Sequence, residues 1–366
     1  MNRRTSVDRP LAFLVALLLV SGMLIFASGA FGLLARGETH ITRAVFNHLV
    51  LGVGAGLVLM VTAALIDYRK LQPYAISIFV TALIATCLVF VPGIGMEHGG
   101  GKRWINFGFG TFQPAELLKL AGIILSAAYF SAIGVRTQTL KWGVGGLCAI
   151  MALPVLLLVL QPDMGTLGVV CIGICTVFFV AGARFHHIAT LIVIGFLLIG
   201  ILAVFRPYVR DRIVTFVNPA HNSQSEGYQI RQSLIAIGSG GMTGRGFGQG
   251  IQKFTYLPEP MGDSIFAVIG EELGFVGSVV FIIGFLLLCL RGYSVAARAP
   301  DAFGLYLGVG IATYLSAEAF INIGAMLGVV PLTGIPLTFV SQGGSAMIVS
   351  LLSAGILLNI SRARKG

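Results

Sequence analysis

Acidic residues stand out in this sequence because carboxylates are scarce in it and could perform acid–base chemistry. The chain has only 14 Asp and Glu residues among 366. Asp263 follows the segment LPEPMG at 257–262 and opens a long apolar run. A carboxylate at such a boundary could serve as a general base. It could equally be the N-cap of the following helix, a position that favours Asp, and its place in the sequence leaves both interpretations open.

Two further sites combine charge with an apolar setting. Glu116 and Lys119 are three residues apart in one apolar run, so they would share a helix face and could form an ion pair. Ionisable groups inside a membrane cost roughly 2.5–3.5 kcal/mol each, and pairing lowers that cost. The alternative is that Lys119 binds an anionic ligand near the surface. Asp163, in QPDMGT at 161–166, is predicted either to cap the next helix or to face a cavity.

The remaining polar residues of the apolar runs predict contacts between helices. Glu271 and Glu272 are adjacent, so their side chains would point about 100° apart and meet different partners, at least one of them a cation or a cavity. Glu318 and Asn322 are four residues apart and are predicted to make a hydrogen-bonded helix contact.

Glycine gathers in three segments: GGGKR at 99–103, GSGG at 238–241 followed by GRGFG at 244–248, and SQGGS at 341–345. Glycine lets a backbone approach a ligand closely, and the nearby Arg103 and Arg245 favour an anion such as a lipid pyrophosphate. Turns or helix packing are the alternative for each segment. None of the three matches a nucleotide-binding P-loop.

The composition defines the elements that must position these residues. The chain is 56% hydrophobic and 10% charged with a mean hydropathy of +0.93, whereas soluble proteins are about 25% charged. This excludes a disordered chain, a disulfide-stapled secreted chain and a soluble nucleic-acid binder, despite the net charge of +10. Long apolar runs instead predict an all-α polytopic membrane protein.

Ten membrane spans are predicted, which places both termini on one side. Lys and Arg are far more frequent in the segments on that side than in the short opposite loops, which predicts cytoplasmic termini. Residues 206–262 then form one large extracytoplasmic loop, and residues 1–366 are expected to form a single domain. The predicted spans are Leu11–Ala35, Val45–Ile66, Tyr74–Val91, Ala115–Gly134, Trp142–Leu160, Thr166–Ala183, Ile188–Phe205, Ser264–Leu290, Ala302–Leu327 and Leu337–Ile360.

Five motifs, in one order along the chain, resemble the SEDS family, the FtsW/RodA peptidoglycan glycosyltransferases. They are GKRWI at 101–105 with FQPAELLK at 112–119, QPDMGT at 161–166, GYQ at 227–229 with QSLIAIGSGG at 232–241, YLPE at 256–259 with DSIFAVIGEELG at 263–274, and SQGGS at 341–345. Two departures affect the site: MG at 261–262 replaces the usual His-Thr, and Gln342 replaces a tyrosine. QK at 252–253 favours the FtsW branch and PLTG at 331–334 the RodA branch, and on balance we expect FtsW.

The resemblance implies that the protein polymerises lipid II at the outer face of the bacterial cytoplasmic membrane, with inversion at the sugar and Asp263 as the general base. The positive end of a helix dipole would keep Asp263 ionised. Arg103 and Lys119 are expected to contact the pyrophosphate. The expected substrate-binding residues are Arg245, a weaker candidate for phosphate contact from the second glycine segment, and, from the matched motifs, Arg103, Gln113, Glu116, Lys119, Asp163, Ser341, Gly343, Gly344 and Ser345.

The resemblance also implies partners. The expected ones are a class B penicillin-binding protein and other division or elongation proteins, with no nucleic acid. Mg²⁺ or Mn²⁺ could stabilise the leaving group, although no ligand cluster in the sequence establishes a metal site. A lipid II flippase, with polar residues near the middle of the membrane, and a non-catalytic division scaffold are the alternative functions.

Overall fold

The structure, a computed structural model, describes residues 6–37, 41–98, 101–108, 110–218 and 226–363. It is mainly helical, with one small antiparallel sheet in the order β1-β2-β3. The elements are α1 (Arg9–Ala35), α2 (Ile41–Phe46), the π-helix η1 (Asn47–Gly54), α3 (Ala55–Leu65), η2 (Tyr68–Leu71), α4 (Ala75–Leu88), β1 (Gly95–His98), β2 (Gly101–Asn106), β3 (Thr111–Phe112), α5 (Pro114–Ile133), η3 (Gly134–Gln138), η4 (Leu140–Val144), α6 (Gly145–Leu160), α7 (Met164–Val180), α8 (Phe185–Phe205), α9 (Pro207–Val217), α10 (Glu226–Ser239), α11 (Gln252–Thr255), α12 (Ile265–Ala297), α13 (Ala302–Met326) and α14 (Gly344–Arg362).

Every predicted span coincides with a helix. Within the described ranges, eight helical segments are long and apolar enough to cross a membrane, and the shorter apolar helices α4 and α7 account for the other two spans. Helices suit this environment because they satisfy their own backbone polar groups where no water is available. α13 and α14 form the most buried part of the bundle, whereas the most apolar stretch of α8 has no buried residue. The protein is therefore a multi-pass membrane protein.

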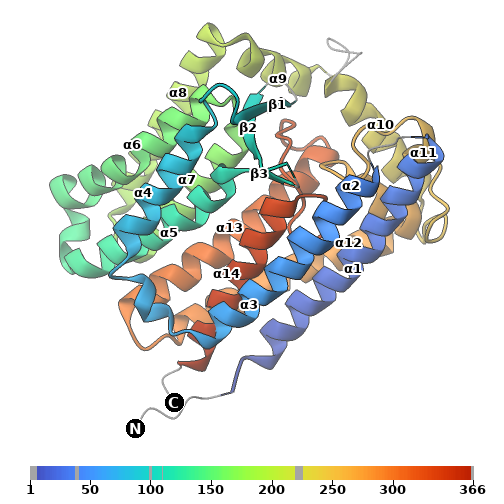
Figure 1. Cartoon of the computed structure of the whole chain (residues 1–366). Coiled ribbons are helices and arrows are strands. Elements are labelled where there is room, and N and C mark those ends of the chain that lie inside the picture. The colour runs from blue at the N-terminus through green and yellow to red at the C-terminus, as the bar shows by residue number, and fades with distance from the viewer. Residues whose placement is uncertain (1–5, 38–40, 99–100, 109, 219–225, 364–366) are drawn as a thin grey trace.

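The two ends of the bundle differ. Near the start of α1, the Asp8 backbone N–H donates to Ser361 Oγ at 3.0 Å, close to the end of α14, and the Asp8 carboxylate accepts from Arg291 at 2.9 and 2.8 Å. The sheet, α9 and α10 lie at the opposite end (Figure 1). The start of α1 and the end of α14 thus share one end of the bundle, as an even number of spans requires.

Two sequence expectations need correction, and one element of the structure was not expected. The last span was expected to start at Leu337, but α14 begins at Gly344, and the residues before it are turns and extended chain. The sheet was not predicted, because its strands are only two to six residues long. Asp263 is not an N-cap: α12 is capped by Ser264, and Asp263 belongs to the preceding turn.

The outer loop at 206–262 is folded over its described part, with α9, α10 and α11; its residues 219–225 lie outside the described ranges. The helix α12 is broken at Gly274 (φ 66°, ψ −162°), a conformation that favours glycine. The outer loop packs against this break and supplies hydrogen-bond acceptors there. Across the break, the N–H groups of Phe275 and Val276 donate to the carbonyls of Gly241 and Met242 at 2.9 and 3.1 Å. The break therefore leaves neither N–H group without a partner.

Candidate active site

The turn that carries Asp263 is fixed through its backbone. Three consecutive carbonyls, those of residues 261, 262 and 263, each accept a hydrogen bond from another part of the chain. The Gln342 N–H donates to the first at 2.6 Å, Ser341 Oγ to the second at 2.7 Å, and Asn322 Nδ2 to the third at 2.8 Å. Asn322 Nδ2 also donates to the carbonyl of Ile335 at 2.8 Å. The irregular segment before α14 and one turn of α13 thus form the support for this turn.

These contacts bear on the two departures from the family motifs. Gln342 contributes its backbone N–H to the turn, so the replacement of a tyrosine leaves this contact intact. Residues 261 and 262 likewise contribute carbonyls. Met261 is buried, and α1 approaches it so closely that a Cβ on Gly29 would lie 3.1 Å from the Pro260 carbonyl oxygen and 3.2 Å from the Met261 side chain.

The Asp263 side chain faces a neutral donor. Gln229 Nε2, from α10, donates to Asp263 Oδ1 and to Ser264 Oγ, both at 2.9 Å. Asp263 is half-buried, and within the described part of the chain its other oxygen, Oδ2, has no hydrogen-bond partner.

The surroundings make Asp263 more basic than an ordinary carboxylate. Burial raises the pKa of its carboxyl to about 6, and the nearby Glu259 carboxylate acts in the same direction. The hydrogen bond from Gln229 and the charge of Arg212 oppose this rise in pKa only in part. A pKa of about 6 still leaves most Asp263 ionised at pH 7, as the sequence predicted, although burial outweighs the expected help from the helix dipole.

Lys119 lies in a closed cluster of charges. Its Nζ is 2.8 Å from Glu116 Oε2 and 2.8 Å from Glu318 Oε1, and all three side chains are buried. The predicted Glu116–Lys119 pair is therefore confirmed, with a second carboxylate added from α13. Two carboxylates thus surround this ammonium group inside the bundle. The expected contact between Lys119 and the pyrophosphate stays a prediction.

Arg103 and Asp163 lie where the sheet meets α5 and α7. Arg103 Nε donates to the carbonyl of Gln161 at 3.2 Å, and its Nη2 donates to that of Pro162. Asp163 caps α7 by accepting from the Thr166 N–H at 3.2 Å, which confirms the N-cap prediction, and it also accepts from Gln113 Nε2 at 3.1 Å.

Gly101 is required beside Arg103. A Cβ at this position would lie 2.8 Å from Arg103 Nε and 2.9 Å from the Gln161 carbonyl oxygen. The described part of the first glycine segment therefore makes room for an arginine. Residues 99 and 100 of that segment lie outside the described ranges.

Arg212, on α9, connects the two groups of residues. Its Nε is 3.0 Å from Glu226 Oε1, its Nη1 donates to the carbonyl of Thr333 at 3.3 Å, and its guanidinium lies over the Tyr208 ring at 4.3 Å. Tyr208 lies close enough to Arg103 and Asp163 for their charges to affect its pKa, and the Arg212 charge reaches Asp263.

Sequence reasoning assigned no role to Arg212, Gln229 or Tyr208, and it predicted a structural contact for Asn322. The signal for Gln229 was present in the GYQ motif at 227–229. Nothing local in the sequence indicates that Asn322 reaches the turn carrying Asp263, because that contact depends on how α13 packs. Glu318 makes a helix contact, with Lys119 on α5, whereas Asn322 donates to the carbonyls of Asp263 and Ile335, which lie outside helices.

The glycines of the last motif pack against η1 and its neighbours. A Cβ on Gly52 would lie 3.3 Å from Gly344 Cα, and the Gly343 N–H donates to His48 Nδ1 at 3.4 Å. Ser345 Oγ accepts from the Gln113 N–H at 3.2 Å. Ser341 is buried against the turn it supports. These four predicted substrate-binding residues, Ser341, Gly343, Gly344 and Ser345, thus hold helices and turns together around the site.

Arg245 belongs to a second charged cluster, away from the turn. Its Nε lies 3.7 Å from Glu271 Oε1. Glu272 pairs with the buried Nζ of Lys253 and accepts from Ser28 Oγ at 2.6 Å. The prediction that Glu271 and Glu272 meet different partners is confirmed, and the structure gives Arg245 a partner other than the expected substrate.

The glycines at 240–250 allow the outer loop to pack onto this cluster. A Cβ at Gly240 would lie 2.0 Å from the Gly270 carbonyl oxygen, and one at Gly244 would lie 2.1 Å from the Glu272 carbonyl oxygen. For this second glycine segment the packing alternative therefore holds.

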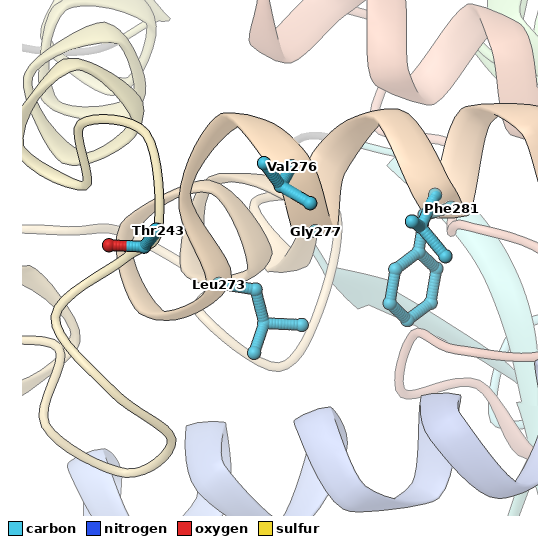
Figure 2. Close-up of a pocket in the computed structure, with 6 residues that line it drawn as sticks. Thr243, Leu273, Val276, Gly277 and Phe281 are labelled. Carbon is cyan, nitrogen blue, oxygen red and sulfur yellow. The ribbon is translucent and has the colours of Figure 1, made fainter.

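An apolar pocket of about 340 Å³ lies on the side of α12, beside the outer loop (Figure 2). It contains none of the predicted site residues and no ionisable side chain, so it offers no acid–base chemistry. Its lining residues are Thr243, Leu273, Val276, Gly277, Val280 and Phe281.

The described residues do not fit a metal site built by the protein. Among them, no group of three or more His, Cys, Asp and Glu side chains is arranged to hold a metal ion. Asp163, the residue considered for a divalent cation, uses its oxygens to accept from Thr166 and Gln113. No reaction step is therefore assigned to Mg²⁺ or Mn²⁺.

Comparison with known proteins identifies the family of the chain. A family model for FtsW, RodA and SpoVE, described as a cell cycle protein, matches residues 9–366. The chain is 39% identical to a probable peptidoglycan glycosyltransferase FtsW of Geobacter metallireducens, over 85% of this chain and 83% of the relative. It is 36% identical to the peptidoglycan glycosyltransferase MrdB of Escherichia coli, over 100% and 97%.

A solved structure has the same fold as this chain. A chain of a peptidoglycan synthase complex, described as coordinating polymerization and crosslinking, superposes with a TM-score of 0.81 and 28% identity over 98% of each chain. The expected preference for the FtsW branch stays a prediction, because the identities to FtsW and MrdB are similar. The chain belongs to the FtsW/RodA/SpoVE family of membrane-embedded peptidoglycan glycosyltransferases.

Proposed function

We propose that this protein polymerises lipid II into glycan strands at the outer face of the cytoplasmic membrane, with Asp263 as the general base. The acceptor sugar hydroxyl gives its proton to the Asp263 carboxylate, and its oxygen attacks the anomeric carbon of the donor. The bond from that carbon to the pyrophosphate breaks, and the lipid pyrophosphate leaves. One displacement converts an α-linked donor into a β-linked product and requires a single base.

The observation that carries this proposal is the placement of Asp263. Its turn lies between the folded outer loop and α12, and its carboxylate is half-buried and has a raised pKa of about 6. A base with a pKa near the working pH combines a large ionised fraction with a strong drive to accept a proton. Glu271, Glu272, Glu116 and Glu318 are instead buried, with cations or backbone donors on their oxygens.

Two of the other expected residues, Lys119 and Arg103, have different roles in this proposal. Lys119 joins α5 to α13 through its ion pair with Glu318, and α13 carries Asn322, which fixes the turn. Arg103 is the expected residue best placed to meet a pyrophosphate, because it lies at the sheet close to Tyr208 and Asp163. The predicted cytoplasmic location of both termini puts this end of the bundle on the outer face. Labelling of single cysteines introduced after Met1 and before Gly366 from either side of the membrane tests that orientation.

The decisive test uses purified protein and labelled lipid II. Wild type should form glycan polymer, and Asp263→Ala should form none while eluting as a folded protein. Equal polymer from both proteins would remove Asp263 as the base. Transbilayer movement of lipid II without polymer would favour the flippase, and neither activity in any preparation would favour the scaffold.

We further propose a class B penicillin-binding protein as partner. The structural relative is part of a complex that couples polymerization to crosslinking, and crosslinking requires a transpeptidase. The partner should raise the polymerisation rate of this protein. Identical rates with and without a co-purified transpeptidase would contradict this regulation.

A further inference from the structure

We infer that Gln229 is the positioning residue of the reaction: its side-chain amide fixes Asp263 Oδ1 and leaves Oδ2 as the oxygen that accepts the proton. This inference rests on the proposed role of Asp263 as the base. It assigns distinct tasks to the two oxygens of one carboxylate.

The orientation of the Gln229 amide follows from its two partners. Its nitrogen lies 2.9 Å from both Asp263 Oδ1 and Ser264 Oγ. An ionised carboxylate can only accept hydrogen bonds, so the NH₂ end must face Asp263. With two N–H groups and two acceptors, both donors are used. The amide is therefore held in one orientation, and it in turn holds the carboxylate.

The backbone of Asp263 is fixed independently of Gln229. Asn322 holds its carbonyl from α13, and Ser341 and the Gln342 N–H hold the two preceding carbonyls. These contacts set where Cα lies, but they leave the side-chain torsions free. Gln229 is the side chain that restrains those torsions, because it contacts the carboxylate itself.

The charged groups around the carboxylate do not replace this restraint. Glu259 on the same loop disfavours the ionised form, and Arg212 on α9 favours it through its charge. The residues contributed by α10 and α13, Gln229 and Asn322, are uncharged. Gln229 therefore does two things: it orients the base and stabilises its charged form.

The test compares two isosteric substitutions on α10. Gln229→Met removes the donor but keeps the shape of the side chain. Gln232→Met is the matched control, because Gln232 lies on the same helix and its side chain makes no hydrogen bond with the described residues. For each protein, the polymerisation rate is measured as a function of pH at saturating lipid II.

Gln229→Met should lower kcat and should move the acidic limb of the profile up by about one pH unit, because the charged form loses a hydrogen bond. Gln232→Met should match wild type in both respects. The position of the limb does not depend on how much enzyme is active, so partial misfolding cannot imitate the shift.

A limb that stays at the wild-type pH in Gln229→Met would overturn the inference, even if kcat fell. Gln229→Glu gives a second measurement: a carboxylate beside Asp263 should move the limb further up than methionine does, and an unmoved limb again contradicts the inference. If Asp263→Ala is inactive while the Gln229 variants titrate like wild type, the proposed function stands and this inference alone fails.

Discussion

Asp263 lies in the turn just before α12, and Glu272, nine residues further along the chain, lies within α12 and pairs with Lys253. The two regions treat charge in opposite ways. Lys253 and Glu272 are completely buried and bound to each other, with Ser28 completing the contact. Asp263 is half-buried, and the side chain that binds it is the neutral Gln229. The comparison shows how a structural charge and a reactive one can lie within one helix and the turn before it.

Removing a charged side chain is expected to change the stability of the fold in opposite directions in the two regions. Removing one partner of a buried ion pair leaves an uncompensated charge and destabilises the fold. A carboxylate with a raised pKa is already less stable in its ionised form in the folded protein than in the unfolded chain. Replacing the Asp263 carboxylate by a neutral side chain should therefore remove an unfavourable charge from the folded protein and, with it, the base.

Asp263→Asn should give the largest difference between the effect on activity and the effect on stability. We expect polymerisation to fall by about 10²–10⁴-fold, the typical contribution of a general base. Thermal stability at pH 7 should be equal to or above that of wild type, because the unfavourable buried charge is gone. Polymer yield and melting temperature of the same preparation provide the measurement. A clear loss of stability would mean that the charge of Asp263 is structural.

Lys253→Met should produce the opposite pattern. The Glu272 carboxylate would remain buried without its cation, and we expect a loss of about 3–5 kcal/mol of stability. Thermal unfolding in detergent measures this loss. The double variant Lys253→Met, Glu272→Gln is the control and should recover part of the stability. If the single variant were as stable as wild type, the pair would not be the clamp that the structure indicates.

The pH profile of wild type tests the same contrast without mutation. The carboxyl group of Asp263 has a pKa of about 6, and only its ionised form can act as the base. Activity should therefore be nearly maximal above pH 7 and fall as the pH drops through 6. At pH 5 the rate should be about tenfold lower than its maximum. Activity that is flat from pH 5 to 7 would contradict the raised pKa. Thermal stability measured at each pH distinguishes titration of the base from unfolding.

Ser341→Ala gives a smaller and more local effect. Two hydrogen bonds of 2.7 Å would be lost, the one that Ser341 Oγ donates to the carbonyl of Gly262 and the one that it accepts from the Leu337 N–H, and such bonds contribute about 1 kcal/mol each. We expect a severalfold lower rate because the turn becomes less well fixed, with the acidic limb of the pH profile unchanged. Ser350→Ala, at a buried serine within α14, is the control for the loss of a hydroxyl. A shift of the limb would mean that Ser341 acts on the charge of Asp263.

The sequence by itself determined the spans, their number, the apolar environment and the small set of carboxylates from which a base could come. These features follow from local properties: the length of apolar runs, helical periodicity and the preference of Asp for helix starts. The N-cap at Asp163 and the pair Glu116–Lys119 are confirmed for that reason, since their partners are three residues away.

Only the tertiary structure decided which charged side chains found an ion-pair partner among the described residues. The contacts Lys119–Glu318 and Ser28–Glu272 join residues 199 and 244 positions apart, and Asn322 reaches Asp263 across 59. Such pairings depend on how helices pack, and a local pattern does not encode them. Packing neutralised the charges of Lys119 and Lys253, and it left Asp263 facing a neutral amide because no basic side chain from a neighbouring helix reaches its carboxylate within the described part of the chain.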